Sequence, residues 1–301
     1  MNKKNILIVG GTGFVGYHLA KSCLKKNWKV TSISIKKPKK IRYLPKVKYI
    51  FCDITKKNFL QKKIKKYFHY VVNLGGYVDH SNRKKTFESH YTGCKNLTEI
   101  FLKNMPLSFI QMGSSVEYGS SESPQIETSK CNPKSIYGKA KLMSTKHLID
   151  IFNKKNFPST VLRLYLAYGP KQDFNRFIPI IIKACIKNEK FPCSKGNQIR
   201  DYIHVEDVVG AIHKTLVSKN ARGKIINIGS GKPRNLKSII EYVKKTTKGG
   251  HPQFGKIKLR KDEVLKIYPN INKAKLNIKW KPKILFKKGL EQTIRSYGKL
   301  K

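Results

Sequence analysis

The chain has 301 residues, of which 39% are hydrophobic and 10% aromatic, so it can bury a sizeable core and is too apolar to be disordered. It carries 64 Lys+Arg against 17 Asp+Glu, a formal net charge of +47. Such a charge often accompanies nucleic-acid or membrane binding. However, only nine of these residues are arginine and the lysines run along the whole chain. We therefore favour a solvated, lysine-rich surface and expect no nucleic-acid or membrane partner.

The cysteines and the apolar segments give no sign of a disulfide-bonded, metal-binding or membrane-spanning protein. No Cys-x-x-Cys occurs and no histidine stands at metal-ligand spacing from a cysteine, so we expect reduced thiols, no metal site and a cytoplasmic protein. No apolar stretch approaches the length of a membrane span. The six cysteines are Cys23, Cys52, Cys94, Cys131, Cys185 and Cys193.

A short apolar strand at residues 6–9 runs into a glycine-rich turn, and a helical pattern follows. Strand, glycine turn and helix form the context that a dinucleotide-binding loop requires. The helix N-terminus then offers N–H groups and a positive dipole end to a pyrophosphate. The residues expected to line this loop are Gly10, Gly13, Phe14, Val15 and Gly16.

The second strand, residues 29–35, ends without the acidic residue that binds the ribose hydroxyls in many NAD proteins. Ser34 occupies that place, and Lys36 and Lys37 follow directly. Two ammonium groups could hold a 2′-phosphate, so the sequence favours NADP(H) over NAD(H). The alternative is that they are two more surface lysines.

Strand-like and helical segments then alternate, which predicts a Rossmann-like, doubly wound parallel sheet in an α/β fold. We expect a dinucleotide-binding domain at 1–168, whose sheet is completed by about 205–230. Residues 169–301 are expected to form mainly a smaller, mixed α/β substrate-binding lobe. The further predicted elements are strands at 47–51, 68–73, 107–112 and 160–165, and helices at 83–103 and 177–187, with two more helical segments after residue 231.

Tyr137 and Lys141 are four residues apart in a helix that Pro133 could open, so they share one helix face. A phenol titrates near pH 10 and is a poor acid or base at neutral pH, but a neighbouring cation favours the phenolate. The pair could therefore transfer a proton. Taken alone, it is a common arrangement on ordinary helices.

Together these motifs resemble the extended short-chain dehydrogenase/reductase family, which acts on nucleotide sugars. The resemblance covers nearly the full length of the chain. It rests on the glycine loop, Asp53, Asn73-Leu-Gly-Gly76, Ser114, Tyr137-x-x-x-Lys141, Arg163-Leu-Tyr165-x-x-Tyr-Gly-Pro170, Arg200-Asp-Tyr-Ile-His-Val, and Lys273-Ala-Lys-x-x-x-x-Lys-Trp280-Lys-Pro282.

The resemblance implies a role for each matching residue. Ser114 would bind the sugar oxygen at the reacting carbon, Tyr137 would give or take the proton, and Lys141 would bind the nicotinamide ribose. A homodimer is also implied. Further cofactor contacts would come from Tyr137 itself, from Asp53 at the adenine, from Ile54, Leu74, Gly75 and Gly76, and from Tyr165 at the nicotinamide. Substrate contacts would come from Ser115, Arg176, Arg200 and Arg260, the last two at the diphosphate.

Departures from the family pattern narrow the chemistry. Family 4,6-dehydratases carry an Asp-Glu pair after the active serine or threonine, whereas this chain has Ser115 and Val116. Glu117 follows, but alternation along a strand would turn it to the opposite face. Two residues that are usually asparagine in the family are replaced by His90 and Leu166, which puts the proton relay and the sugar contacts in question.

Three functions therefore remain open. The leading prediction is NADPH-dependent C4 reduction of a 4-keto-6-deoxy nucleotide sugar. The alternative is a nucleotide-sugar C4 epimerase that retains its NAD. A third, from a different class, is a catalytically inactive nucleotide-sensing module, which would have no need of an intact Ser114, Tyr137 and Lys141.

Overall fold

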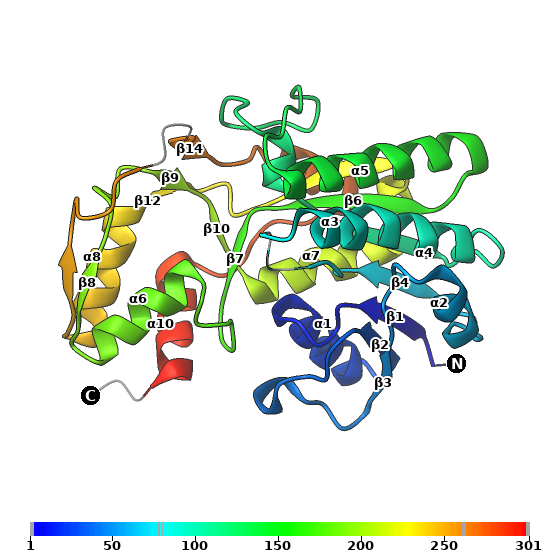
Figure 1. Ribbon diagram of the computed structural model, residues 1–301, viewed down its shortest axis with the longest axis horizontal. Helices are drawn as coiled ribbons and strands as arrows, with labels where there is room; N and C mark the ends of the chain where they lie inside the picture. The colour runs from blue at the N-terminus through cyan, green and yellow to red at the C-terminus, as the bar shows by residue number, and fades with distance from the viewer. Residues whose placement is uncertain (1–2, 78, 80, 260–262, 299–301) are drawn as a thin grey trace.

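The computed structural model describes residues 3–77, 79, 81–259 and 263–298 (Figure 1). A parallel seven-stranded sheet forms its centre, in the order β11-β6-β5-β4-β1-β2-β3. This confirms the predicted Rossmann-like fold. The strands are β1 (Asn5–Val9), β2 (Lys29–Ser34), β3 (Val47–Phe51), β4 (Tyr70–Asn73), β5 (Ser108–Ser114), β6 (Ser159–Leu164) and β11 (Lys224–Ile228).

The central strands are apolar because helices cover both faces of the sheet. In β1, Ile6 and Ile8 face one layer of helices, while Leu7 and Val9 face the other. All four side chains are at most 2% exposed. One layer holds α1 (Phe14–Lys25), α7 (Val205–Val217) and α9 (Asn272–Ile278), and the other holds α2 (Lys57–Lys63), α4 (Gly93–Phe101) and α5 (Ile136–Lys155).

The helix predicted at 83–103 consists of three consecutive helical segments. α3 (Arg83–Phe87) passes into a π-helical turn, η2 (Glu88–Thr92), which continues as α4. π-helical turns are rare and frequently occur at functional sites. This turn contains His90, one of the residues that departs from the family pattern.

The second lobe, at the left of Figure 1, has its own apolar core between α6 (Phe177–Ile186), α8 (Leu236–Thr247) and α10 (Phe286–Tyr297). Among the described residues, three helices follow residue 231 where two were expected, because α9 is only seven residues long. None of the described helices is both long and apolar enough to cross a membrane. Short strands complete this part of the chain: β7 (Leu166–Tyr168) with β10 (Tyr202–His204), β8 (Lys190–Pro192) with β13 (His251–Gln253), and β9 (Ile199–Arg200) with β12 (Arg234–Asn235) and β14 (Lys266–Ile267). Single turns lie at η1 (Lys40–Arg42), η3 (Ser115–Tyr118) and η4 (Lys219–Ala221).

Candidate active site

The glycine loop joins the carboxyl end of β1 to the start of α1. Gly10 has φ +77°, a left-handed conformation that favours glycine. A Cβ added at Gly16 would lie 2.3 Å from the carbonyl oxygen of Gly10. The close approach of helix to loop therefore excludes a side chain at Gly16.

The N-terminus of α1 is open to a ligand. Gly13 is its N-cap, and within the described chain no side chain caps this end and the first turn holds no acidic residue. The first-turn N–H groups, including those of Phe14 and Val15, thus keep the positive end of the helix dipole available to an anion. This geometry fits the pyrophosphate of a dinucleotide.

The end of β2 lies beside this loop. The Ser34 hydroxyl accepts a hydrogen bond from the Thr12 backbone at 3.4 Å. Lys36 and Lys37 are exposed, and neither forms an ion pair with another described residue. Both ammonium groups can therefore turn toward a phosphate at the end of β2.

Asp53 and the ends of β1 and β4 lie along the same edge of the sheet. The Asp53 Oδ1 accepts a hydrogen bond from the Thr55 backbone at 2.9 Å, and Ile54 is buried. A Cβ on Gly10 would lie 3.0 Å from the Leu74 carbonyl oxygen. Gly75 is buried and Gly76 exposed where β4 ends, so these two positions place no side chain at this edge of the sheet.

Tyr137 and Lys141 lie on α5, as predicted, but Pro133 does not open this helix. α5 begins at Ile136, and Ser135 is the N-cap, whose hydroxyl accepts a hydrogen bond from the Gly138 backbone at 3.1 Å. Serine is preferred at that position because its oxygen satisfies a first-turn N–H.

The Lys141 side chain crosses from α5 to the sheet. It is 4% exposed, and its Nζ donates a hydrogen bond to the Met112 carbonyl oxygen at 2.7 Å. The same Nζ lies 5.8 Å from the centroid of the Tyr137 ring. An ammonium group has three donors, so the bond to Met112 leaves two that could bind ribose hydroxyls.

His90 packs directly against Tyr137. The two ring centroids are 4.9 Å apart, edge to face, and His90 Nε2 lies 3.3 Å from the Tyr77 carbonyl oxygen. Ser144 of α5 donates a hydrogen bond to the His90 carbonyl at 2.8 Å. The π-helical turn is thus held against the helix that carries Tyr137.

Ser114 is the last residue of β5 and is 8% exposed. The expectation that Glu117 turns to the opposite face of a strand is wrong, because residues 115–118 form a 3₁₀ turn. Within it, the Glu117 Oε1 accepts a hydrogen bond from the Ser114 N–H at 2.9 Å. The Ser114 hydroxyl accepts one from Val116 N–H at 3.3 Å, and Ser115 is 9% exposed.

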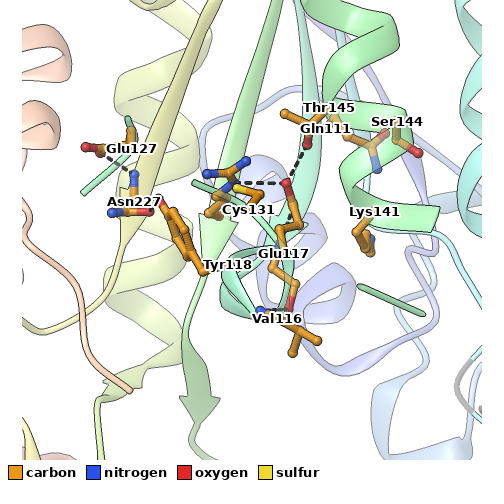
Figure 2. A network of polar contacts seen from close by, with 12 residues as sticks. Gln111, Val116, Glu117, Tyr118, Glu127, Cys131, Lys141, Ser144, Thr145 and Asn227 are labelled. Carbon is orange, nitrogen blue, oxygen red and sulfur yellow. Dashed lines mark hydrogen bonds and ion pairs between the residues drawn. The ribbon is translucent and has the colours of Figure 1, made fainter. Parts of the chain in front are cut away.

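The Glu117 carboxylate is fully buried and is the centre of the network in Figure 2. Its Oε2 accepts hydrogen bonds from the Thr145 hydroxyl at 2.7 Å and from Arg163 Nε at 2.9 Å. Burial lowers the pKa of Arg163, but the Glu117 carboxylate opposes this and the net shift is upward. Arg163 and Glu117 therefore form an ion pair inside the protein.

The other predicted site residues are Tyr165 and three arginines. Tyr165 is buried, and its hydroxyl donates a hydrogen bond to the Gln125 side chain at 2.8 Å. Arg200 is ion-paired with Glu263 at 2.5 Å. Arg176 is exposed and is the N-cap of α6. Arg260 lies outside the described residues.

A cavity of about 260 Å³ lies elsewhere, between β10 and the segment 282–287. None of the predicted site residues lines it. The arrangement around Ser114 and Tyr137 is instead an edge of the sheet, where α5 packs on β5 and the ends of β4 and β1 lie beside β5. Ligands of open α/β sheets bind at this edge.

The structure brings most of the predicted site residues to one edge of the sheet. It also shows a contact that the sequence did not predict, between Glu117 and Thr145. Thr145 lies four residues beyond Lys141, so the spacing 137, 141, 145 places all three on one face of α5. That spacing is a signal in the sequence. The structural role of Thr145 becomes clear only from its hydrogen bond to Glu117 in the protein interior.

The chain matches a family model described as "NAD dependent epimerase/dehydratase family" over residues 6–229. Two relatives are similar over nearly the full length. One, from Methanocaldococcus jannaschii, is named "Putative UDP-glucose 4-epimerase" and is 27% identical, covering 96% of this chain and 97% of the relative. The other, "CDP-abequose synthase" of Salmonella muenchen, is 26% identical and covers 98% of each.

Among solved structures, the UDP-glucose 4-epimerase of Thermotoga maritima, determined with UDP-glucose, superposes with a TM-score of 0.91. It is 24% identical, and the match covers 97% of this chain and 98% of that one. At this identity the likeness concerns the fold, which extends over both the sheet and the second lobe.

Proposed function

The chain belongs to the NAD dependent epimerase/dehydratase family, and on that premise we propose that this enzyme reduces the C4 carbonyl of a 4-keto-6-deoxy nucleotide sugar with NADPH. In the reaction the carbonyl carbon gains a hydride and the oxygen gains a proton, giving an alcohol. When bound, the nicotinamide cofactor supplies the hydride. The protein's part is to hold the sugar, orient the carbonyl and deliver the proton.

Three side chains would divide that work. The Ser114 hydroxyl would hydrogen-bond the C4 oxygen, and the Tyr137 phenol would donate its proton to that oxygen. Lys141, anchored on the Met112 carbonyl, would bind the nicotinamide ribose and favour the phenolate that remains. The buried, hydrogen-bonded surroundings of this cluster support such electrostatic preorganisation.

The observation that carries the choice of cofactor is the pair Lys36 and Lys37. Both are exposed just after β2, which ends in Ser34 and not in a ribose-binding acid. The choice against dehydration rests on Glu117, whose carboxylate is committed to Arg163 and Thr145.

The second candidate is a nucleotide-sugar C4 epimerase that retains NAD, which the relative and the solved structure with epimerase names favour. The same three residues would serve it, since an epimerase oxidises and re-reduces one carbon.

The proposal also includes the domain division at residue 168, binding of a diphosphate by Arg200 and Arg260, and a homodimer.

Purified protein should be denatured and its released cofactor identified, and the native protein tested on a panel of nucleotide sugars. For a reductase we expect little bound cofactor and NADPH consumption with a 4-keto-6-deoxy nucleotide sugar. Retained NAD, with interconversion of UDP-sugars and no NADPH consumption, would replace the reductase by the epimerase. No turnover on either arm would favour the nucleotide-sensing module.

A further inference from the structure

We infer that Glu117, with Thr145 and Arg163, is a positioning network that holds Ser114 in register with Tyr137 and Lys141. The inference rests on the proposed function in one respect: it takes Ser114, Tyr137 and Lys141 as the residues that act on the sugar and the cofactor. It holds equally for reduction and for epimerisation, because both need the serine and the tyrosine on the same sugar oxygen.

The first step of the argument is the connection itself. Ser114 ends β5, whereas Tyr137 and Lys141 lie on α5. Glu117 joins the two elements with one carboxylate: Oε1 accepts from the Ser114 N–H at 2.9 Å and Oε2 from the Thr145 hydroxyl at 2.7 Å. A single rigid group thus sets the position of the serine backbone relative to the helix.

A second tie lies one helical turn away. Lys141 donates to the Met112 carbonyl at 2.7 Å, and Met112 is two residues before Ser114 on the same strand. The ties from positions 141 and 145 of α5 therefore fix both the distance and the rotation of the helix against the end of β5. Tyr137, one turn further toward the N-terminus, follows from that placement.

The cost of this arrangement indicates that it serves more than stability. Burying a charge pair commonly stabilises a fold no better than apolar side chains of the same volume would. Here Arg163 is 2% and Glu117 0% exposed, and the Arg163 guanidinium lies 4.4 Å from the centroid of the Tyr118 ring. Tyr118 in turn donates a hydrogen bond to the Asn227 side chain at 2.7 Å (Figure 2).

The surrounding sequence makes room for the carboxylate. A Cβ added at Gly113 would lie 2.6 Å from Glu117 Oε1 and 3.0 Å from Val161 Cγ1. Glycine is needed here because a side chain would take the space of the Glu117 carboxylate. The backbone conformation does not require it, since the chain is extended within β5. The residue before Ser114 is thus fitted to Glu117.

The test is Thr145→Val, which removes the tie to α5 but leaves the Glu117–Arg163 ion pair intact, so the protein should fold. Thr145→Ser restores the hydroxyl. The matched control is Thr215→Val, because Thr215 is also buried and its hydroxyl bonds within α7, to Ala211 at 2.8 Å, and to no other described residue. All three are compared with wild type on the substrate that the panel identifies.

For Thr145→Val we expect kcat to fall between about tenfold and about a hundredfold, since a small misplacement of reacting groups costs that much. KM for the nucleotide sugar and Kd for the cofactor should stay within about twofold. Tm should fall further in Thr145→Val than in Thr215→Val, because the first change leaves a buried carboxylate oxygen with one donor fewer. Thr145→Ser should recover most of kcat. Equal kcat values for Thr145→Val and Thr215→Val would overturn the inference.

Hydrogen exchange gives a readout that needs no substrate. The Ser114 amide donates to Glu117, so the amide hydrogens of residues 113–118 should exchange faster in Thr145→Val than in wild type. In Thr215→Val their exchange rate should be that of wild type. Unchanged exchange in both variants also overturns the inference, whatever the substrate. A wild type without turnover on the whole panel would sink the proposed function instead, and the exchange comparison would still decide the positioning role.

Discussion

Tyr137 and Lys141 gain their meaning from what surrounds them. On the chain they are two residues one helical turn apart. In the structure, the lysine reaches the Met112 carbonyl, and the tyrosine packs edge to face on His90. These contacts restrict both side chains, and the helix that carries them is tied through Glu117 to Ser114 at the end of β5.

Tyr137→Phe removes the proposed proton donor and keeps the ring contact with His90. We expect turnover to fall by at least about a hundredfold, the usual contribution of a general acid. Cofactor affinity, measured by isothermal titration, should stay within about twofold, because the phenol is not among the proposed phosphate or adenine contacts. Full turnover in this variant would remove Tyr137 from the mechanism.

Lys36 and Lys37 decide the proposed cofactor preference. Changing both to serine should weaken NADPH binding by roughly tenfold, as expected for losing a charge-assisted contact, and leave NADH binding nearly unchanged. The matched control is the same change at Lys65 and Lys66, two exposed lysines that alter the net charge equally. An equal loss for NADPH and NADH, or an equal effect of the control pair, would contradict a 2′-phosphate site.

At the scale of elements, the turn between β1 and α1 is the most constrained part of the site. Its glycines are needed because helix and loop backbones approach each other more closely than any side chain allows. The π-helical turn before α4 is a second such feature, since it presents His90 to α5. No periodicity in the sequence separates that turn from ordinary helix.

Gly16→Ala should place a methyl group 2.3 Å from the Gly10 carbonyl. We expect a loss of about 1–3 kcal/mol in the free energy of unfolding, the usual cost of overpacking, together with loss of cofactor binding. Gly210→Ala in α7 is the control. Its Cβ would meet Trp280 Nε1 at 3.6 Å, an ordinary contact, so it should stabilise the protein by about 0.5–1 kcal/mol. Chemical denaturation measures both, and equal effects would contradict the loop geometry.

At the scale of the whole molecule, α7 begins at a buried histidine, His204, and carries a half-buried one, His213. His204 caps the start of α7, and His213 lies 2.9 Å from the Ser22 hydroxyl of α1. Burial lowers the pKa of His204 to about 4, with a smaller contribution from His18. Burial, and to a lesser degree Lys26, lowers the pKa of His213 to about 4.

These shifts make stability depend on pH. An unfolded histidine titrates near 6.5, so between pH 6.5 and 4 the unfolded chain binds more protons than the folded one. The free energy of unfolding therefore falls as the pH drops through this range. We expect Tm to decrease from pH 7.5 to pH 5, and His204→Asn with His213→Gln to flatten that decrease.

Asparagine is a good N-cap, so the change at His204 should keep α7 capped. Exposed His251 provides the control, because its replacement by glutamine should leave the pH dependence unchanged. Thermal unfolding at several pH values measures all three proteins. Parallel pH curves for wild type and the double variant would show that these histidines do not control the acid sensitivity.

The amino-acid sequence by itself determined the fold class and the family, and it predicted the edge of the sheet at which a cofactor would bind. Those features are written locally, in apolar strands, in glycines at fixed spacing, and in a tyrosine and lysine one helical turn apart. Each depends on residues near one another along the chain, so pattern and propensity suffice to recognise them. The start of α5 was misplaced for the same reason: Pro133 and Ser135 are both good starting residues, and only packing chooses between them.

Only the tertiary structure decided the role of Glu117. Its partners, Ser114, Thr145 and Arg163, come from three different elements. Whether it faces the site or the core depends on the 3₁₀ turn that ends β5. A carboxylate is stable at this depth because Arg163 and two hydrogen-bond donors reach it together. That convergence is a property of the folded chain, and it is what joins Ser114 to Tyr137 and Lys141.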